Sequence, residues 1–121
     1  MRIGTDIVGV ERMRRSCAKE SFLRRVYTER EYSQFENKSD PVPSLAANWA
    51  AKEAFSKALG TGVRGFELTE VEVLRDELGA PYFVLSGKAK EIADKMGLKP
   101  SVSLSHEKEY AVAFVVCEEV L

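Results

Sequence analysis

Cysteine is scarce in this chain of 121 residues, and long apolar runs are missing. The two cysteines, Cys17 and Cys117, have no metal-binding spacing, and a single disulfide would be unusual in a reducing compartment. We therefore expect both to act as small apolar side chains. No stretch approaches the roughly 18 apolar residues of a membrane-spanning helix, and the N-terminal residues contain no apolar segment of a secretion signal. These absences predict a cytoplasmic protein.

The chain also lacks an excess of charge of either sign, because its net charge is only −1. The overall charge therefore gives no indication of a nucleic-acid partner. The charge is unevenly distributed, because residues 11–25 carry a local net charge of +4. Within this segment, Arg12, Arg15 and Lys19 would share one face of a helix. The segment is either a solvated helix surface or a docking surface for an acidic partner. The candidate docking residues on this face are Arg12, Arg15 and Lys19.

The composition, with 45 % hydrophobic and 31 % charged residues, is typical of a folded protein. The length suits one domain over residues 1–121. In chain order, the expected elements are a strand at 3–10, helices at 11–19 and 22–36 with Thr28 as a cap, a loop at 37–43, a helix from Ser44 to Gly60, strands at 68–74 and 82–85, a helix at 86–96, and strands at 101–106 and 110–117. We therefore predict an α+β fold with a mostly antiparallel sheet packed against a long central helix.

The most informative segment is the predicted helix over 47–58, which is apolar on two opposite faces. Such a helix is buried on both sides, yet it contains Lys52, Glu53 and Lys57. Charged side chains are rarely buried without a partner or a function. An ordinary ion pair between Glu53 and Lys57, one helical turn apart, is one explanation. A functional site is the other.

Two further polar residues occupy unexpected positions. Asp6 lies in an apolar strand, where aspartate is depleted, and a buried carboxylate needs a cation, a cluster of donors or a metal. Together with Glu53 it could bind one hard cation such as Mg²⁺, which accepts one or two protein carboxylates. His106, the single histidine, ends an alternating strand. Packing is the ordinary explanation for such a histidine, and a role in a functional site is the alternative.

Four segments form a recognisable set. Residues 3–12 read I-G-T-D-I-V-G-V-E-R, residues 49–62 read W-A-A-K-E-A-F-S-K-A-L-G-T-G, residues 75–81 read R-D-E-L-G-A-P, and residues 103–113 read S-L-S-H-E-K-E-Y-A-V-A. In order and spacing they resemble the holo-acyl-carrier-protein synthase family, the small 4′-phosphopantetheinyl transferases. The second segment is similar to the signature F-A-A-K-E-A-x-x-K-A-x-G-T-G, with Trp49 in place of phenylalanine. The third resembles the turn N-D-x-x-G-x-P.

The resemblance implies transfer of the 4′-phosphopantetheine group of coenzyme A to a serine of apo acyl carrier protein. Adenosine 3′,5′-bisphosphate is released, and the product supports fatty acid biosynthesis. The resemblance also implies Mg²⁺ bound by Asp6 and Glu53, with Lys57 on the pyrophosphate. Either Glu53 or a metal-bound water is the implied base. The implied coenzyme A contacts are Lys57, Gly60, Thr61, Gly62 and His106, although the glycines fit a simple helix C-cap equally well.

The resemblance further implies a homotrimer with coenzyme A in clefts between protomers. It also implies that the acidic carrier protein docks on Arg12, Arg15, Lys19 and Arg25. The chain departs from the family where the 3′-phosphate is bound. Many members have a Lys-Arg pair in the loop and an arginine at the position of Asn48, whereas here only Lys38 is basic. We expect either weak discrimination against 3′-dephospho-coenzyme A or a replacement, such as Lys38, Arg64 or a neighbouring protomer's residue. A magnesium-dependent nucleotide phosphohydrolase and a non-catalytic carrier-binding module remain competing functions.

Overall fold

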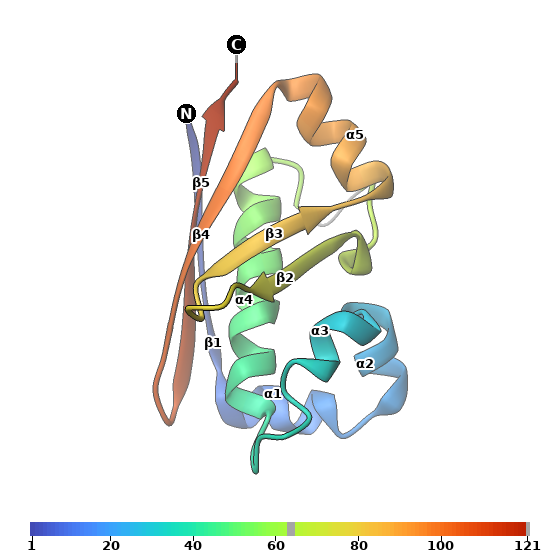
Figure 1. Cartoon of the computed structure of the whole chain (residues 1–121), viewed down its shortest axis with the longest axis vertical. Coiled ribbons are helices and arrows are strands. Elements are labelled where there is room, and N and C mark those ends of the chain that lie inside the picture. Colours follow the sequence, from blue (N-terminus) through green and yellow to red (C-terminus); the bar gives the residue numbers. More distant parts are fainter. Residues whose placement is uncertain (63–64, 121) are drawn as a thin grey trace.

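The computed structural model describes residues 1–62 and 65–120, and it has the α+β fold expected from the sequence (Figure 1). A three-stranded sheet and a two-stranded sheet, both antiparallel, lie around one long helix. In chain order, the elements are β1 (Arg2–Gly9), α1 (Val10–Cys17), α2 (Glu20–Val26), α3 (Glu29–Ser33), α4 (Val42–Leu59), the 3-10 helix η1 (Leu68–Glu70), β2 (Val71–Arg75), β3 (Pro81–Leu85), α5 (Gly87–Met96), β4 (Leu98–His106) and β5 (Tyr110–Glu119).

The larger sheet has the strand order β1-β5-β4, and α4 packs against one of its faces. The side chains of β5 that face α4 are small and fully buried, among them Ala111 and Ala113. A Cβ atom at Gly4 of β1 would collide with the backbone oxygen of Ala54 in α4. This close approach of helix and strand places the middle of β1 directly beside the second half of α4.

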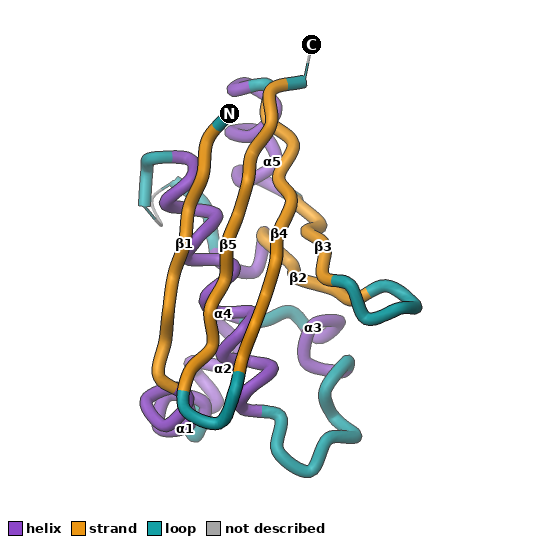
Figure 2. The backbone as a smooth tube through the Cα atoms, turned by 90° about the vertical axis from the view of Figure 1, so that its left-hand side faces the viewer, coloured by secondary structure: helices purple, strands orange, loops and turns teal. Residues whose placement is uncertain are grey.

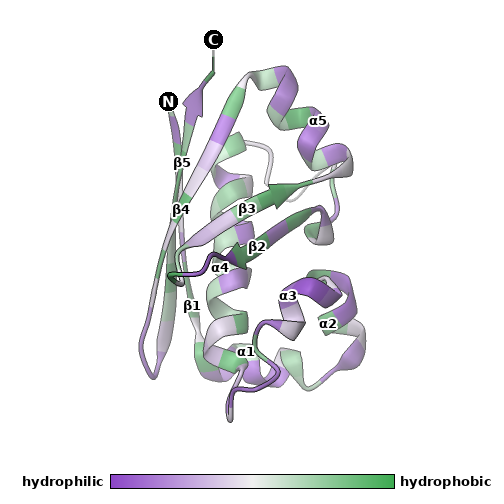
Figure 3. Cartoon of the chain, viewed as in Figure 1, coloured by the Kyte–Doolittle hydropathy of each residue, from purple (hydrophilic) through white to green (hydrophobic). Residues whose placement is uncertain are grey.

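Helix α4 is buried on both sides, as its apolar pattern predicts, because β2 and β3 cover the side that the larger sheet leaves free (Figure 1). Hydrophilic positions lie along α4 among the hydrophobic ones (Figure 3). The helix begins at Val42, before the expected cap Ser44. Pro41 and Pro43 are compatible with a helix that begins at Val42, because N–H groups in the first turn of a helix have no intrahelical acceptor and proline has no N–H to leave unpaired. Gly60 ends α4 with φ of 78°, as expected of a C-cap glycine.

The opposite face of the larger sheet is uncovered in this chain. Figure 2 shows β1, β5 and β4 toward the viewer, with no helix of the described residues crossing in front of them. Large apolar side chains on this face are exposed, including Ile3 (61 %), Ile7 (62 %) and Phe114 (41 %). They alternate along their strands with the buried residues that face α4.

The helices that precede α4 also differ from the sequence-based expectation. The helix expected at 22–36 is broken at Tyr27 and Thr28, which are extended, and Thr28 then caps α3 through a capping box with Glu31. Helix α1 ends at Cys17, so Lys19 lies outside it and does not continue the helical face of Arg12 and Arg15. Within the described part of the chain, no helix has the length and apolar character needed to cross a membrane.

Candidate active site

Asp6, Glu53 and Lys57 come together where β1 crosses α4. The ammonium group of Lys57 donates to Asp6 Oδ1 and to the carbonyl oxygen of Thr5, each at 3.0 Å. The ion pair expected as the ordinary explanation, between Glu53 and Lys57, is therefore replaced by one between Lys57 and Asp6. Three residues that the family resemblance placed in one site are thus neighbours in space.

The carboxylate of Glu53 has no hydrogen-bond donor among the described residues. Burial raises its pKa, the negative charge of Asp6 raises it further, and Lys57 partly opposes this shift. The sequence predicted buried carboxylates in apolar elements, and both are partly buried; the side chain of Asp6 is 16 % exposed. Their position lets them reach a ligand from solvent.

Both carboxylates line a pocket of about 370 Å³ formed by β1, α1, α2 and α4. Its apolar wall includes Phe22 and Trp49, whose ring centroids lie 5.5 Å apart. This wall accounts for the desolvation of Glu53. Arg12 lines the same pocket, so this basic residue lies at the edge of the candidate active site.

The two carboxylates fit Mg²⁺ better than a metal bound entirely by protein. Among residues 1–62 and 65–120, no group of three or more histidine, cysteine, aspartate or glutamate side chains is arranged so that it could hold a metal ion by itself. Mg²⁺ usually binds one or two carboxylates and completes its octahedron with water and substrate phosphates. Asp6 and Glu53, facing an open pocket, are the residues that would bind it.

His106 lies elsewhere. It ends β4 and lines a separate pocket of about 520 Å³, together with Lys38 and Arg75. Within one chain, the structure therefore does not bring His106 together with Asp6 and Glu53.

Gly60, Thr61 and Gly62 follow α4, one turn beyond Lys57. The side chain of Arg2 donates to the last carbonyl groups of this helix, Ala58 at 2.7 Å and Leu59 at 3.0 Å. This contact supports the interpretation of Gly60 as a helix C-cap. The segment is nevertheless exposed, so a phosphate could reach its backbone.

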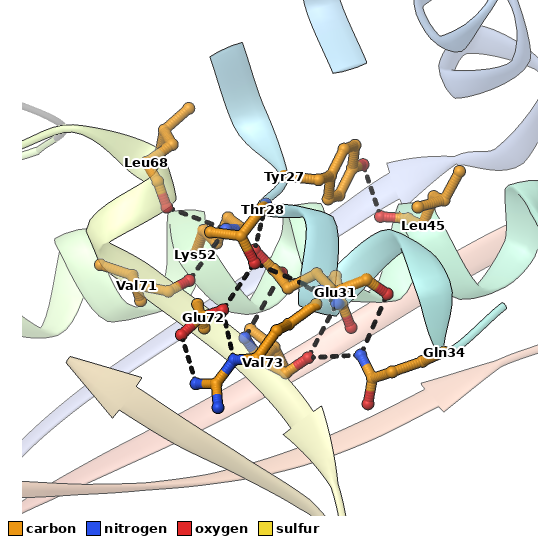
Figure 4. A network of polar contacts seen from close by, with 12 residues as sticks. Tyr27, Thr28, Glu31, Gln34, Leu45, Lys52, Leu68, Val71, Glu72 and Val73 are labelled. Carbon is orange, nitrogen blue, oxygen red and sulfur yellow. Dashed lines mark hydrogen bonds and ion pairs between the residues drawn. The ribbon is translucent and has the colours of Figure 1, made fainter. Parts of the chain in front are cut away.

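Lys52 is part of a buried network rather than of the pocket (Figure 4). Its ammonium group donates to Glu31 Oε1 at 2.7 Å and to the carbonyl oxygens of Leu68 and Val71, both at 2.8 Å. The sequence flagged Lys52 as a buried charge but did not identify its partner. The sequence feature that could have drawn attention to Glu31 is its place in the capping box that begins at Thr28.

The basic docking candidates Arg12, Arg15, Lys19 and Arg25 are all exposed. None forms an ion pair with a described residue, whereas two neighbouring arginines do. Arg14 binds Asp40 through two hydrogen bonds of 3.0 and 2.9 Å, and Arg24 binds Glu20 at 2.7 Å. The four candidates are thus the residues of this segment whose charge is available to a partner.

Comparison with known proteins supports one family. The family model of the 4′-phosphopantetheinyl transferase superfamily matches residues 2–115. A holo-[acyl-carrier-protein] synthase of Ruminiclostridium cellulolyticum is 46 % identical over 121 residues, which cover 96 % of this chain and 90 % of the relative. Another, from Thermoanaerobacter sp. (strain X514), is 44 % identical over 116 residues and covers 94 % of this chain and 84 % of the relative.

Solved structures support the same family. The holo-[acyl-carrier-protein] synthase of Neisseria meningitidis has a TM-score of 0.88 and 37 % identity, with 98 % of both chains covered. The enzyme of Helicobacter pylori in complex with coenzyme A has a TM-score of 0.82 and 32 % identity, and covers 96 % of this chain and 99 % of its own. These matches confirm the resemblance seen in the motifs: the chain belongs to the 4′-phosphopantetheinyl transferase superfamily and is a transferase.

Proposed function

We propose that this protein is a holo-[acyl-carrier-protein] synthase. The serine oxygen of the carrier protein attacks the phosphorus that bears pantetheine, and the bond to the bridging pyrophosphate oxygen breaks. Adenosine 3′,5′-bisphosphate leaves, and the serine proton passes to a base. The observation that carries this proposal is the pocket lined by Asp6 and Glu53 with Lys57 bound to Asp6. Related structures contain coenzyme A, which supports the choice of donor.

The residues of the pocket have separate tasks in this reaction. Lys57, whose side chain is 55 % exposed, contacts a pyrophosphate oxygen while remaining anchored to Thr5 and Asp6. Asp6 and Glu53 are the residues that would hold Mg²⁺, and the ion would supply positive charge to offset the negative charge of the pyrophosphate and of the leaving group. Glu53 or a metal-bound water serves as the base that accepts the serine proton.

We further propose a homotrimer, as the family resemblance implies. The uncovered sheet face presents Ile3, Ile7 and Phe114 to solvent, and contiguous exposed apolar side chains mark an interface. The partner is a second copy of this chain, because the coenzyme A contact His106 lies in a different pocket from Asp6 and Glu53. Neighbouring copies would bring the two pockets into one cleft. Light scattering at assay concentration tests this, and a monomer with full activity would contradict it.

The carrier protein would dock on Arg12, Arg15, Lys19 and Arg25. Their charges have no acidic partner in the described residues, and Arg12 joins this surface to the pocket of Asp6 and Glu53. An acidic helix bound there would bring its serine to the pyrophosphate. Cytoplasmic location and a role in fatty acid biosynthesis follow from the same proposal.

Mass spectrometry of apo acyl carrier protein tests the function directly. After incubation with coenzyme A and Mg²⁺, the carrier should gain the mass of one phosphopantetheine group. Asp6→Asn and Glu53→Gln should each abolish this gain, while Glu91→Gln, at an exposed site on α5, should not. Hydrolysis of coenzyme A without carrier would instead indicate a phosphohydrolase, and carrier binding without mass gain a binding module.

A further inference from the structure

The pocket of about 520 Å³ that contains His106 collects basic side chains from three separate parts of the chain. Lys38 comes from the loop before α4, Arg75 from the end of β2 and His106 from the end of β4. The polar side chains of Gln34 and Ser44 also line it, and no acidic side chain does. Such a pocket suits an anion.

Arg75 is held in place, but it forms no ion pair with any residue in the described part of the chain. Its guanidinium group lies over the ring of Phe35, with the central carbon 5.4 Å from the ring centroid, and its backbone N–H donates to Gln34 Oε1 at 2.8 Å. The Nη1 atom is shielded from solvent, yet it has no hydrogen-bond partner among the described residues. Burial also lowers the pKa of Arg75. Because guanidinium groups bind carboxylates and phosphates through several hydrogen bonds, Arg75 is a candidate anion-binding residue.

Asn48 has a different environment. It is fully buried, and its Nδ2 atom donates to Glu31 Oε2 and to the carbonyl oxygen of Val73, both at 3.0 Å. It therefore belongs to the network around Glu31 and cannot contact a phosphate in solvent. The family motifs place arginine at the position of Asn48 and asparagine at the position of Arg75. In this chain the two residue types are exchanged, so the arginine absent from α4 is present at the end of β2.

We propose, on the basis of the function proposed above, that Arg75 is the specificity-determining residue for the 3′-phosphate of coenzyme A, assisted by Lys38 and His106. A phosphate monoester offers several oxygen acceptors to the planar guanidinium group, which Phe35 keeps in a fixed orientation. The enzyme then discriminates strongly against 3′-dephospho-coenzyme A despite lacking arginine at position 48. Of the replacements expected from the sequence, Lys38 contributes and Arg64 lies outside the described residues.

Binding of two nucleotides to the assembled enzyme tests this inference without any transfer reaction. Calorimetry should show that adenosine 3′,5′-bisphosphate binds more tightly than adenosine 5′-monophosphate. Arg75→Met, which keeps an apolar stem over Phe35, should weaken binding of the bisphosphate by about ten-fold or more, because charge-assisted hydrogen bonds are lost. Binding of the monophosphate should stay within about two-fold, which also shows that the variant is folded. Arg24→Met, at an exposed ion pair, is the matched control.

Transfer kinetics provide the second measurement. The ratio of kcat/KM for coenzyme A to that for 3′-dephospho-coenzyme A should fall by about ten-fold in Arg75→Met and by less in Lys38→Met. An unchanged ratio, or equal weakening of both nucleotides, would overturn the role of Arg75. If Arg75→Met does not fold, an unchanged ratio in Lys38→Met overturns the proposed site. If the unmodified enzyme does not transfer phosphopantetheine, the proposed function is wrong. The role of Arg75 is still decided by the nucleotide comparison, because that measurement needs no carrier protein.

Discussion

Replacing Lys52 by methionine should strongly destabilise the fold. The substitution keeps the length of the side chain and removes only the ammonium group. That group makes three hydrogen bonds, one to Glu31 and two to the backbone of Leu68 and Val71, and both charged side chains are 0 % exposed (Figure 4). The variant therefore leaves Glu31 buried without its cation, and it also leaves two carbonyl groups without this donor.

The expected loss can be estimated. Removing one partner of a buried ion pair costs about 3–5 kcal/mol, a large share of the roughly 5–15 kcal/mol by which a domain is stable. With a urea dependence of about 2 kcal/mol per molar, the unfolding midpoint should fall by about 2 M. Because trimer formation would make stability depend on concentration, the proteins must be compared at one protomer concentration.

The loss should also depend on pH. Burial raises the pKa of Glu31, and the charge of Lys52 opposes this, so the pKa rises further once Lys52 is gone. A carboxyl group with a raised pKa in the folded state binds a proton that the unfolded state releases. The folded state therefore loses stability as pH rises from the ordinary glutamate pKa toward the raised value. The deficit of Lys52→Met should be larger at pH 8 than at pH 5.

Urea unfolding of Lys52→Met, Glu31→Gln and the double variant at both pH values tests this reasoning. The double variant should recover a large part of the deficit, since it removes the unpaired charge. A deficit of about 1 kcal/mol or less at pH 8, the value of an exposed pair, would refute it. A deficit that is the same at both pH values would show that the charge of Glu31 is not its cause.

Two further predictions concern the site and its surroundings. In metal-free protein, an NMR titration should show that Asp6→Asn lowers the pKa of Glu53 and Lys57→Met raises it, because one substitution removes a like charge and the other an opposite charge. If Asp6→Asn does not lower the pKa of Glu53, the two carboxylates are not neighbours. Reversing the charge of Arg12 or Arg15 should raise KM for the carrier protein and reduce its salt dependence, while KM for coenzyme A barely changes. If both KM values rise together in transfer assays, the docking surface is wrongly assigned.

The sequence predicts the elements of this fold better than their boundaries. The apolar pattern identified α4 and its burial on two sides, and the turn residues identified both hairpins. The strand expected from residue 101 instead begins at Leu98 and includes Pro100. Proline is acceptable there because β4 lies at an edge of the sheet, where it pairs only with β5. Position within the sheet is a tertiary property that a local pattern does not contain.

The candidate site was predictable in its residues but not in its distances. Asp6 and Glu53 each stood out as a charge in an apolar element, and only the family resemblance joined them. Their proximity depends on Gly4, whose missing side chain allows β1 to approach the backbone of Ala54. The counterion of Lys52 was not predictable from periodicity, because Glu31 lies on another helix and its choice of partner depends on how α3 packs.

The adjacent residues Lys52 and Glu53 show how the core supports the site. Successive side chains of a helix are separated by about 100°, so these two point to different sides of α4. On one side, the bonds of Lys52 to Glu31 and to the backbone around β2 fix the rotation of the helix about its axis. On the other side, contact with Gly4 fixes its distance from β1. With rotation and distance both determined, the backbone of Glu53 is held beside Asp6, so the buried ion pair positions a residue that it never touches.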